Sequence, residues 1–442
     1  MGENETRDKL PIIDLSAHSE MIYIILELIY PRADEPQFRG LDVFRKVCKT
    51  AQLYSMTVVE EKLKKQILAS QFMKSEPFRL YAIAIDLGWE AMALAAARET
   101  LQIPLTKLAF IDELQDISGA AFYRFLNYRF RCDNSMDISK DNLMVQELPD
   151  KKTNIFESGA EALGSFSASP TGNIVLRSSD SVDFFVIEGL IRFVSPFFDR
   201  KFPLGEHEEV DGRPVIDVLE DSTVLRYLLD LIYPASEELD IPDCHLYREL
   251  VRAARKFEMS KVVERLQKQG IALAYEEPLR MYAIAISLGL DEVAEVAARE
   301  TLSQPLQEMS FVAEFYQITG ADMFRLMRYW FNCADAVRQV IKTNDTRTTQ
   351  GFAHLGIQGS GVFGTVSPPG DSEESLVKLY QRLEDCPRGI TYRAICTLEV
   401  ASRSGYHPSY CHMNISSFDA IERYREGLVA AIEIAISKVC SV

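Results

Sequence analysis

The sequence lacks a hydrophobic run long enough to cross a membrane. No stretch of about 18 consecutive apolar residues occurs anywhere in the 442-residue chain. The N-terminus lacks the basic and then apolar order of a secretory signal. It matches the loose myristoylation pattern, but acidic neighbours at Glu3 and Glu5 and the absence of a basic cluster argue against lipidation. These absences predict an intracellular protein, cytoplasmic or nuclear, with no membrane partner.

Paired cysteines and an excess of positive charge are also missing. None of the eight cysteines forms a C-x-x-C pair, which favours reduced thiols over a disulfide framework. Lys and Arg number 48 against 65 Asp and Glu, so the formal net charge is −17. Because such a field repels phosphate, we expect no nucleic-acid partner.

The sequence has little that resembles a catalytic or cofactor site. Its six histidines are scattered, and no Ser-His-Asp or Cys-His arrangement can be assembled from them. A G-x-G-x-x-G match at residues 359–364 is followed by Pro368-Pro369 and not by a helix, which favours a linker over a dinucleotide site. We therefore expect no enzyme, no cofactor and no small-molecule substrate.

One cluster of possible metal ligands lies near the C-terminus. It consists of Cys386, Cys396, His407, Cys411 and His412. Zinc takes four such ligands, but structural zinc sites usually carry closely paired cysteines, and Cys386 and Cys396 are widely spaced. A partly buried thiol cluster without metal is the preferred interpretation, and zinc binding is the alternative.

What the sequence does contain is an internal repeat. Residues 81–101 return at residues 282–302, with 14 of 21 positions identical. Upstream matches have an offset of 203 residues and downstream matches an offset of 201, so the segment between them differs by two residues. Copies this far apart indicate a duplicated domain, because solenoid repeats have periods of about 20–50 residues.

Both copies predict a strand, a helix and then a series of packed helices. The strands are expected at Ile12-Ile13 and Val215-Ile216. The next helices carry the apolar stripes Ile22, Ile25, Leu26, Ile29 and Leu225, Leu228, Leu229, Ile232, and end before Pro31 and Pro234. The later helices are expected near residues 41–53, 56–69, 76–87, 89–101 and 107–132, and near 245–257, 259–273, 277–288, 290–302 and 308–333.

Only the second copy has additional residues ahead of this series. Asn173–Leu176 and Phe184–Ile187 have the pattern of two strands in a hairpin, with a polar turn between them. A helix is expected from about Glu188, and Ser195-Pro196 predicts the start of another, because serine caps a helix and proline suits its first position.

The ordered series in the second copy resembles a BTB/POZ domain of the type abundant in fungi. The resemblance rests on the opening strand and turn at residues 173–180, the second strand at 184–186, the Val194–Phe198 segment that resembles an S-P-x-F signature, and residues 214–263. The helices near 277–333 resemble the extension found in the fungal families. Three positions depart from the family: Asn173 replaces a usual aspartate, Ile187 a usual histidine and Glu188 a common lysine.

The resemblance implies a predominantly helical α+β fold with a duplicated BTB/POZ-like domain, the first copy being truncated or diverged. Its implied function is non-catalytic protein–protein interaction, either self-association or heterodimer formation. For some members it implies recruitment of substrates to a cullin-based ubiquitin ligase. The alternative is a fungal scaffold or transcription-associated regulator without a ubiquitin role.

The resemblance also marks a candidate interaction surface in the second copy. It comprises Leu190, Ile191, Phe193, Phe197, Phe198 and Phe202. The same apolar residues at helical spacing could instead form core, and the sequence leaves the division open. If they form an interface, Ile191→Asp is expected to give a folded monomer.

The predicted organisation has five parts. Residues 1–150 form the partial copy, 151–172 a linker, 173–340 the complete domain with its helical extension, 341–375 a flexible linker and 376–442 a C-terminal helical segment. In that last segment, helices are expected at residues 376–383 and 417–439, and we expect them to pack on the second copy rather than to dock in a partner's groove.

Overall fold

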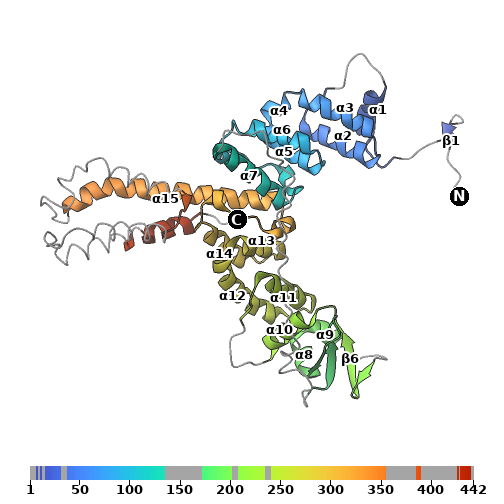
Figure 1. Ribbon diagram of the computed structural model, residues 1–442, viewed down its shortest axis with the longest axis vertical. Coiled ribbons are helices and arrows are strands. Elements are labelled where there is room, and N and C mark those ends of the chain that lie inside the picture. Colours follow the sequence, from blue (N-terminus) through green and yellow to red (C-terminus); the bar gives the residue numbers. More distant parts are fainter. Residues whose placement is uncertain are drawn as a thin grey trace. The chain divides into compact units, whose positions relative to one another are not determined.

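The computed structural model divides the chain into two compact units, Met1–Gln146 and Glu147–Val442 (Figure 1). The residues that it describes are 6–7, 10–11, 15–30, 37–134, 172–201, 208–233, 240–354, 385–389, 426–427 and 429–439. The predicted strand at Ile12-Ile13, the two prolines at 31 and 234, the G-x-G-x-x-G match and the helix at 376–383 lie outside them.

The described residues of the first unit are helical apart from a minimal two-stranded ladder. Its elements are β1 (Thr6–Arg7), β2 (Leu10–Pro11), α1 (Ser19–Ile29), α2 (Leu41–Leu53), α3 (Thr57–Leu68), α4 (Phe72–Ser75), α5 (Pro77–Asp86), α6 (Glu90–Thr100), the 3-10 turns η1 (Leu105–Lys107) and η2 (Asp112–Gln115), and α7 (Gly119–Asn134). The core lies where α5 packs on α6 and α7: Phe78 and Tyr81 contact the ring of Phe125 at centroid distances of 5.3 and 4.8 Å.

The second unit opens with a four-stranded sheet. Its strands are β3 (Ile174–Arg177), β4 (Asp183–Val186), β5 (Glu209–Val210) and β6 (Arg213–Asp217), in the order β4-β3-β6-β5. β3 and β4 form the predicted antiparallel hairpin, and β6 runs parallel to β3 with Val175 opposite Val215. Two short helices, α8 (Glu188–Val194) and α9 (Pro196–Lys201), separate β4 from β5.

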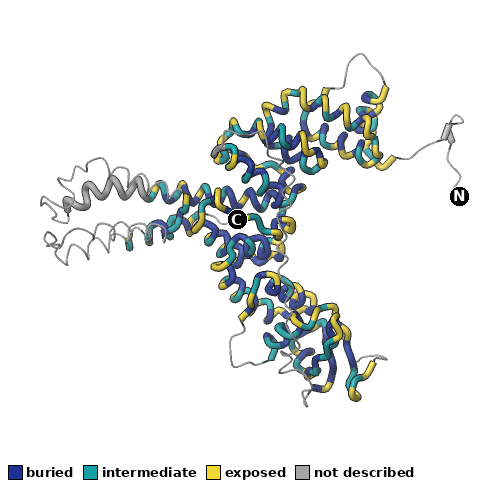
Figure 2. Tube along the Cα trace, viewed as in Figure 1, coloured by how far each residue is buried: buried dark blue, intermediate teal, exposed yellow. Residues whose placement is uncertain are grey.

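The remaining described helices of the second unit follow the order of the first. They are α10 (Ser222–Ile232), α11 (Cys244–Lys256), α12 (Ser260–Glu276), α13 (Pro278–Leu288), α14 (Asp291–Thr301), the 3-10 turns η5 (Leu306–Glu308) and η6 (Ala313–Gln317), and α15 (Gly320–His354). Buried residues concentrate where α11–α14 pack on one another (Figure 2). The prediction of a predominantly helical α+β chain is therefore confirmed, with a small sheet in the second unit.

The repeat in the sequence is also a repeat of contacts. The Lys62 ammonium donates to the carbonyl of Leu28 at 2.6 Å, and Arg265 donates to that of Leu231 at 2.5 Å. The hydroxyls of Tyr81 and Tyr282 donate to the carbonyls of Ala121 and Asp322, each at 2.9 Å. Gly88 and Gly289 end α5 and α13 with positive φ angles of 70° and 59°, which glycine adopts at little cost. Residues at equivalent sequence positions thus make the same contacts between equivalent helices in the two units.

The two-residue difference between the copies lies between α3 and α5. In the first unit the chain leaves α3 at Leu68 and forms the separate turn α4 before Pro77. In the second unit α12 continues without a break to Glu276, and α13 begins at Pro278. The copies therefore differ by a break in one helix, and the helices on either side stay equivalent.

Two predicted helices begin later than the sequence suggested. The helix expected at 107–132 begins at Gly119, and the helix expected at 308–333 begins at Gly320, each after two 3-10 turns. The reason is local capping. The Ser118 hydroxyl accepts from the Ala121 N–H at 3.2 Å, and the Asp322 carboxylate accepts from the Thr319 N–H at 2.9 Å.

The flexible linker predicted from residue 341 is wrong at its start. α15 continues to His354, because residues 341–354 contain no proline and a single glycine that could interrupt a helix already begun at Gly320. No helix among the described residues is long and apolar enough to cross a membrane.

The described part of the C-terminal segment packs on the second unit, as expected. Ile432 and Ile436 are buried. The Arg388 guanidinium lies 2.9 Å from the Glu300 carboxylate of α14 and 3.3 Å from that of Glu433. The segment is thus joined to α14 through Arg388, and two of its isoleucines are shielded from water.

Candidate functional site

The structure divides the six residues of the predicted interaction surface. Phe193 is 87% exposed, and Leu190 and Phe197 are half-buried. Ile191 and Phe198 are 0% and 1% exposed, and Phe202 lies outside the described residues. Ile191 and Phe198 are therefore core, the alternative that the sequence left open, and do not belong to an accessible surface.

These two residues are core because the α8–α9 turn is fastened to α11. The Ser195 hydroxyl donates to the Phe257 carbonyl at 2.5 Å and accepts from the Phe198 N–H at 3.2 Å. The Phe198 ring lies 4.9 Å from that of Phe257. Ser195 is fully buried, and its hydroxyl makes both hydrogen bonds. It acts as the expected cap of α9 and also connects the α8–α9 turn to the end of α11.

Phe193 stands out because its helix is otherwise polar on the outside. The neighbouring Arg192 pairs with Glu188 at 3.1 Å and with Asp199 at 2.8 Å. These exposed pairs contribute little to stability, but they fix the flank from which the phenylalanine projects. Aromatic residues are enriched in protein interfaces, so Phe193 is the candidate contact residue of this helix.

The three positions that depart from the resembled family lie together at the start of α8. The Glu188 N–H donates to the Asn173 side-chain oxygen at 2.8 Å, and the Ile187 N–H donates to the Tyr233 hydroxyl at 2.9 Å. Asparagine thus satisfies one of the free N–H groups of the first helical turn, as an aspartate would. The departures change charge without leaving these donors unpaired.

Three buried cysteines have thiols whose pKa is raised. Burial, with the nearby Glu277 carboxylate, raises the pKa of Cys244 to about 12. Burial likewise raises the pKa of Cys333 to about 11, against the stabilising effect of its hydrogen bond with Tyr329. Cys48 is fully buried, and its pKa is raised for the same reason. Because the thiolate is the nucleophile, these cysteines are packing residues.

The possible zinc cluster cannot be assembled from the described residues. Cys386 is half-buried, and Cys396, His407, Cys411 and His412 lie outside them. Within the part of the chain that the structure describes, no three His, Cys, Asp or Glu side chains are grouped closely enough to hold a metal ion.

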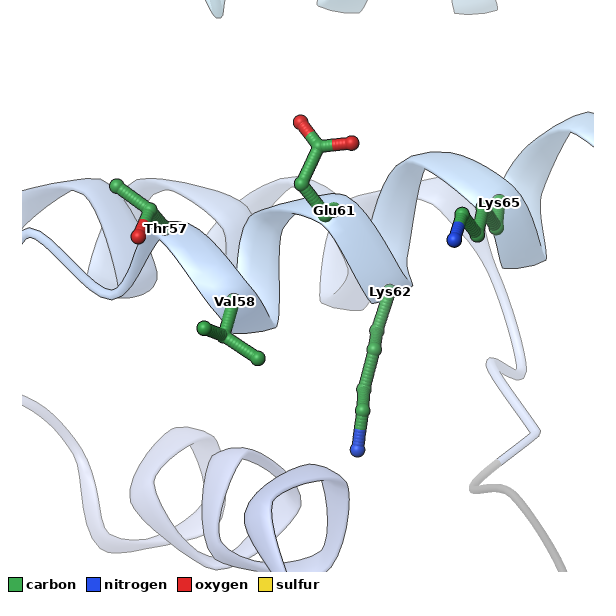
Figure 3. Close-up of a pocket in the computed structure, with 5 residues that line it drawn as sticks. All are labelled: Thr57, Val58, Glu61, Lys62 and Lys65. Atoms are coloured by element: carbon green, nitrogen blue, oxygen red, sulfur yellow. The ribbon is translucent and has the colours of Figure 1, made fainter.

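A shallow depression of about 360 Å³ lies on the first unit (Figure 3). It is lined by Thr57, Val58, Glu61, Lys62 and Lys65, all from the outer face of α3. Residues from a single helix leave the hollow open to water. Its charged groups are solvated, and Lys62 is already engaged with the end of α1. The depression offers no enclosed site for chemistry.

Ion pairs between a partly exposed arginine and a buried glutamate recur at equivalent positions and stabilise the scaffold. The Arg79 guanidinium lies 2.6 Å from the Glu113 carboxylate, and Arg280 lies 3.3 Å from Glu314. Both glutamates are buried, so removing either arginine would leave an uncompensated buried charge. These pairs tie α5 to η2 and α13 to η6.

Sequence reasoning missed an exposed apolar surface in the first unit. It consists of Leu15, Leu26, Ile29 and Tyr30, and we call it the α1 surface. The predicted stripe placed Leu26 and Ile29 inward, but the residues that α1 buries are Met21, Ile25 and Leu28. The sequence held one sign of this surface: the apolar residues of α1 cover more of the helix circumference than a single buried face needs.

Comparison with known proteins adds no relative: no protein-family model, no curated protein and no solved structure matches this chain. The functional argument therefore rests on the molecule itself.

Proposed function

We propose that this chain is a non-catalytic protein–protein interaction module of the BTB/POZ type, in which the second unit is the complete domain and the first a diverged copy. Its surface around Phe193 mediates self-association. The observation that carries the proposal is the 87% exposure of Phe193 on a helix anchored to the core through Ser195 and Ile191. An aromatic side chain on an anchored helix has few torsions to order on binding, and aromatic anchors contribute strongly at interfaces.

Co-purification of two differently tagged copies of the full chain tests this role. Phe193→Asp is expected to abolish recovery of the second copy, because burying a carboxylate in an apolar contact is costly. Leu219→Asp is the matched control, since Leu219 is 82% exposed in the same unit but lies after β6 and not on α8. Circular dichroism should be unchanged for both variants. Recovery of Phe193→Asp at the wild-type level would refute the assignment.

The recruitment of a cullin-based ligase stays a prediction from the resemblance. A pull-down with the full chain tests it, with a known adaptor as the positive control. Failure to recover a cullin under conditions in which that adaptor does so would favour the alternative, a scaffold or regulator without a ubiquitin role.

A further inference from the structure

The first helix of each repeat has different surroundings in the two units. With the offset of 203 residues, α1 corresponds to α10, and Leu26 corresponds to Leu229. Leu229 is 1% exposed, whereas Leu26 is 44% exposed. The residue four positions before each helix shows the same contrast, because Val218 is 7% exposed and its counterpart Leu15 is 43% exposed. A side chain of the same kind is thus covered in one copy and open in the other.

In the second unit the β3–β4 hairpin is hydrogen-bonded to both ends of α10. At one end, the Ser222 hydroxyl and N–H donate to the Asp180 carboxylate in the hairpin turn at 2.6 and 2.8 Å. At the other end, the Tyr233 hydroxyl accepts from the Ile187 N–H just after β4 at 2.9 Å. The hairpin is therefore fastened at both ends of the helix and extends along its length.

The hairpin has a simple chemical description. The strands bury an apolar set on one face of the hairpin: Ile174 and Leu176 of β3, and their partners Val186 and Phe184 of β4. Its turn carries a carboxylate at the N-terminal end of α10, where the helix dipole favours negative charge. The hairpin thus offers apolar side chains and a turn carboxylate, and α10 offers apolar side chains, a serine at its start that donates to the carboxylate and a tyrosine after its end that accepts from the backbone of the hairpin.

In the first unit, α1 has the same residues at its two ends as α10 has. Ser19 stands at the position of Ser222 and Tyr30 at that of Tyr233. Both are exposed, and Tyr30 is 64% exposed. His18 makes no side-chain cap to α1, whereas the Asp221 carboxylate caps α10 at 2.8 Å. The start of α1 therefore has donors free for an incoming carboxylate.

We propose that the α1 surface is a docking site for a β-hairpin supplied by a partner protein, a hairpin with apolar inward residues and an aspartate in its turn. This deepens the proposed interaction role, because it names a second surface and the chemistry that it recognises. The hairpin of another copy of this chain is not the occupant. It is already bonded to its own α10, and moving it would expose one apolar helix in order to cover another.

Fluorescence anisotropy with a labelled peptide tests the proposal. The probe is a synthetic peptide of residues 172–187, which has the apolar strands and the turn aspartate that the proposal requires and stands in for the partner's hairpin. It is added to the full chain. Saturable binding is expected, at least tenfold weaker for Leu26→Asp. Val58→Asp is the matched control, because Val58 is 72% exposed on α3 of the same unit, and it should bind as the wild type does. A peptide with Asp180→Ala should bind more weakly than one with Ser179→Ala.

A second measurement covers the case of a weakly binding peptide. The same 16 residues are fused ahead of the full chain through a Gly/Ser linker, which raises the local hairpin concentration to about the millimolar range. Slower hydrogen exchange at residues 19–30, reversed by Leu26→Asp, is the expected result. Unchanged exchange together with no peptide binding would overturn the proposal. So would a Leu26→Asp variant that changes the molar mass of the chain but not its peptide binding, because the surface would then join two copies.

The Phe193→Asp variant separates this inference from the proposed function. Phe193 lies on α8 of the second unit, so the variant should bind the hairpin peptide with wild-type affinity. Loss of self-association with intact peptide binding, or the reverse, would assign each failure to its own surface.

Discussion

Truncating the two equivalent leucines should affect the two units by very different amounts. Leu229→Ala removes a side chain that is 1% exposed and leaves a cavity between α10 and its cover. Such substitutions cost about 2–5 kcal/mol. Leu26→Ala removes a side chain that is already 44% exposed, so roughly half of the transfer free energy is lost and little cavity forms. We expect a cost of about 1 kcal/mol or less.

The two tryptophans allow each unit to be followed by itself. Trp89 lies in the first unit and Trp330 in the second, and both are buried. Leu26→Ala is measured in a Trp330→Phe background and Leu229→Ala in a Trp89→Phe background, each by urea denaturation with tryptophan fluorescence. Equal losses in the two units would refute the claim that α10 is covered while α1 is open.

Three further predictions concern single positions. Gly270→Ala should destabilise the second unit by about 1–3 kcal/mol, because the new Cβ would lie 2.7 Å from the ring of Tyr247, and Tyr247→Phe should relieve part of that loss in a double-mutant cycle. Ser55→Gly should raise the midpoint of unfolding of the first unit, since Ser55 has a φ of 54° that glycine adopts without strain, whereas Ser55→Ala should not. Cys244, whose pKa in the folded chain is raised to about 12, should resist alkylation at pH 9 unless urea is added. Its contribution to the free energy of unfolding is complete below the unfolded pKa of about 8.5 and falls as the pH rises above that value. Cys244→Ala should remove this pH-dependent part of the stability.

Local patterns predicted most of the helices and the hairpin. Helix periodicity placed most helices of both copies to within a few residues, with α7 and α15 as the exceptions. Ser195-Pro196 placed the start of α9, because capping depends on neighbours in the chain. The late starts of α7 and α15 were missed, since the buried apolar residues before them, Leu114 and Phe315, fit a helical pattern and a 3-10 turn equally well.

Exposure could not be predicted, because it depends on what another segment covers. Ile191 and Phe193 are both apolar and lie two positions apart on a helix of seven residues, and only the contacts around Ser195 decide which one points inward. The same holds for Leu26 and Leu229, which have equivalent sequence surroundings and opposite exposure. An apolar stripe in the sequence therefore does not show which of its residues form a contact surface, and the structure of the whole unit does.

The molar mass of the full chain in solution tests the central claim most directly. Light scattering across a range of protein concentrations should give a wild-type mass that rises to twice the chain mass of 50.1 kDa, and a Phe193→Asp mass that stays at 50.1 kDa. Dissociation without loss of helical circular dichroism would support association through α8. A wild-type mass of 50.1 kDa at every concentration, or a dimer that Phe193→Asp leaves intact, would contradict it.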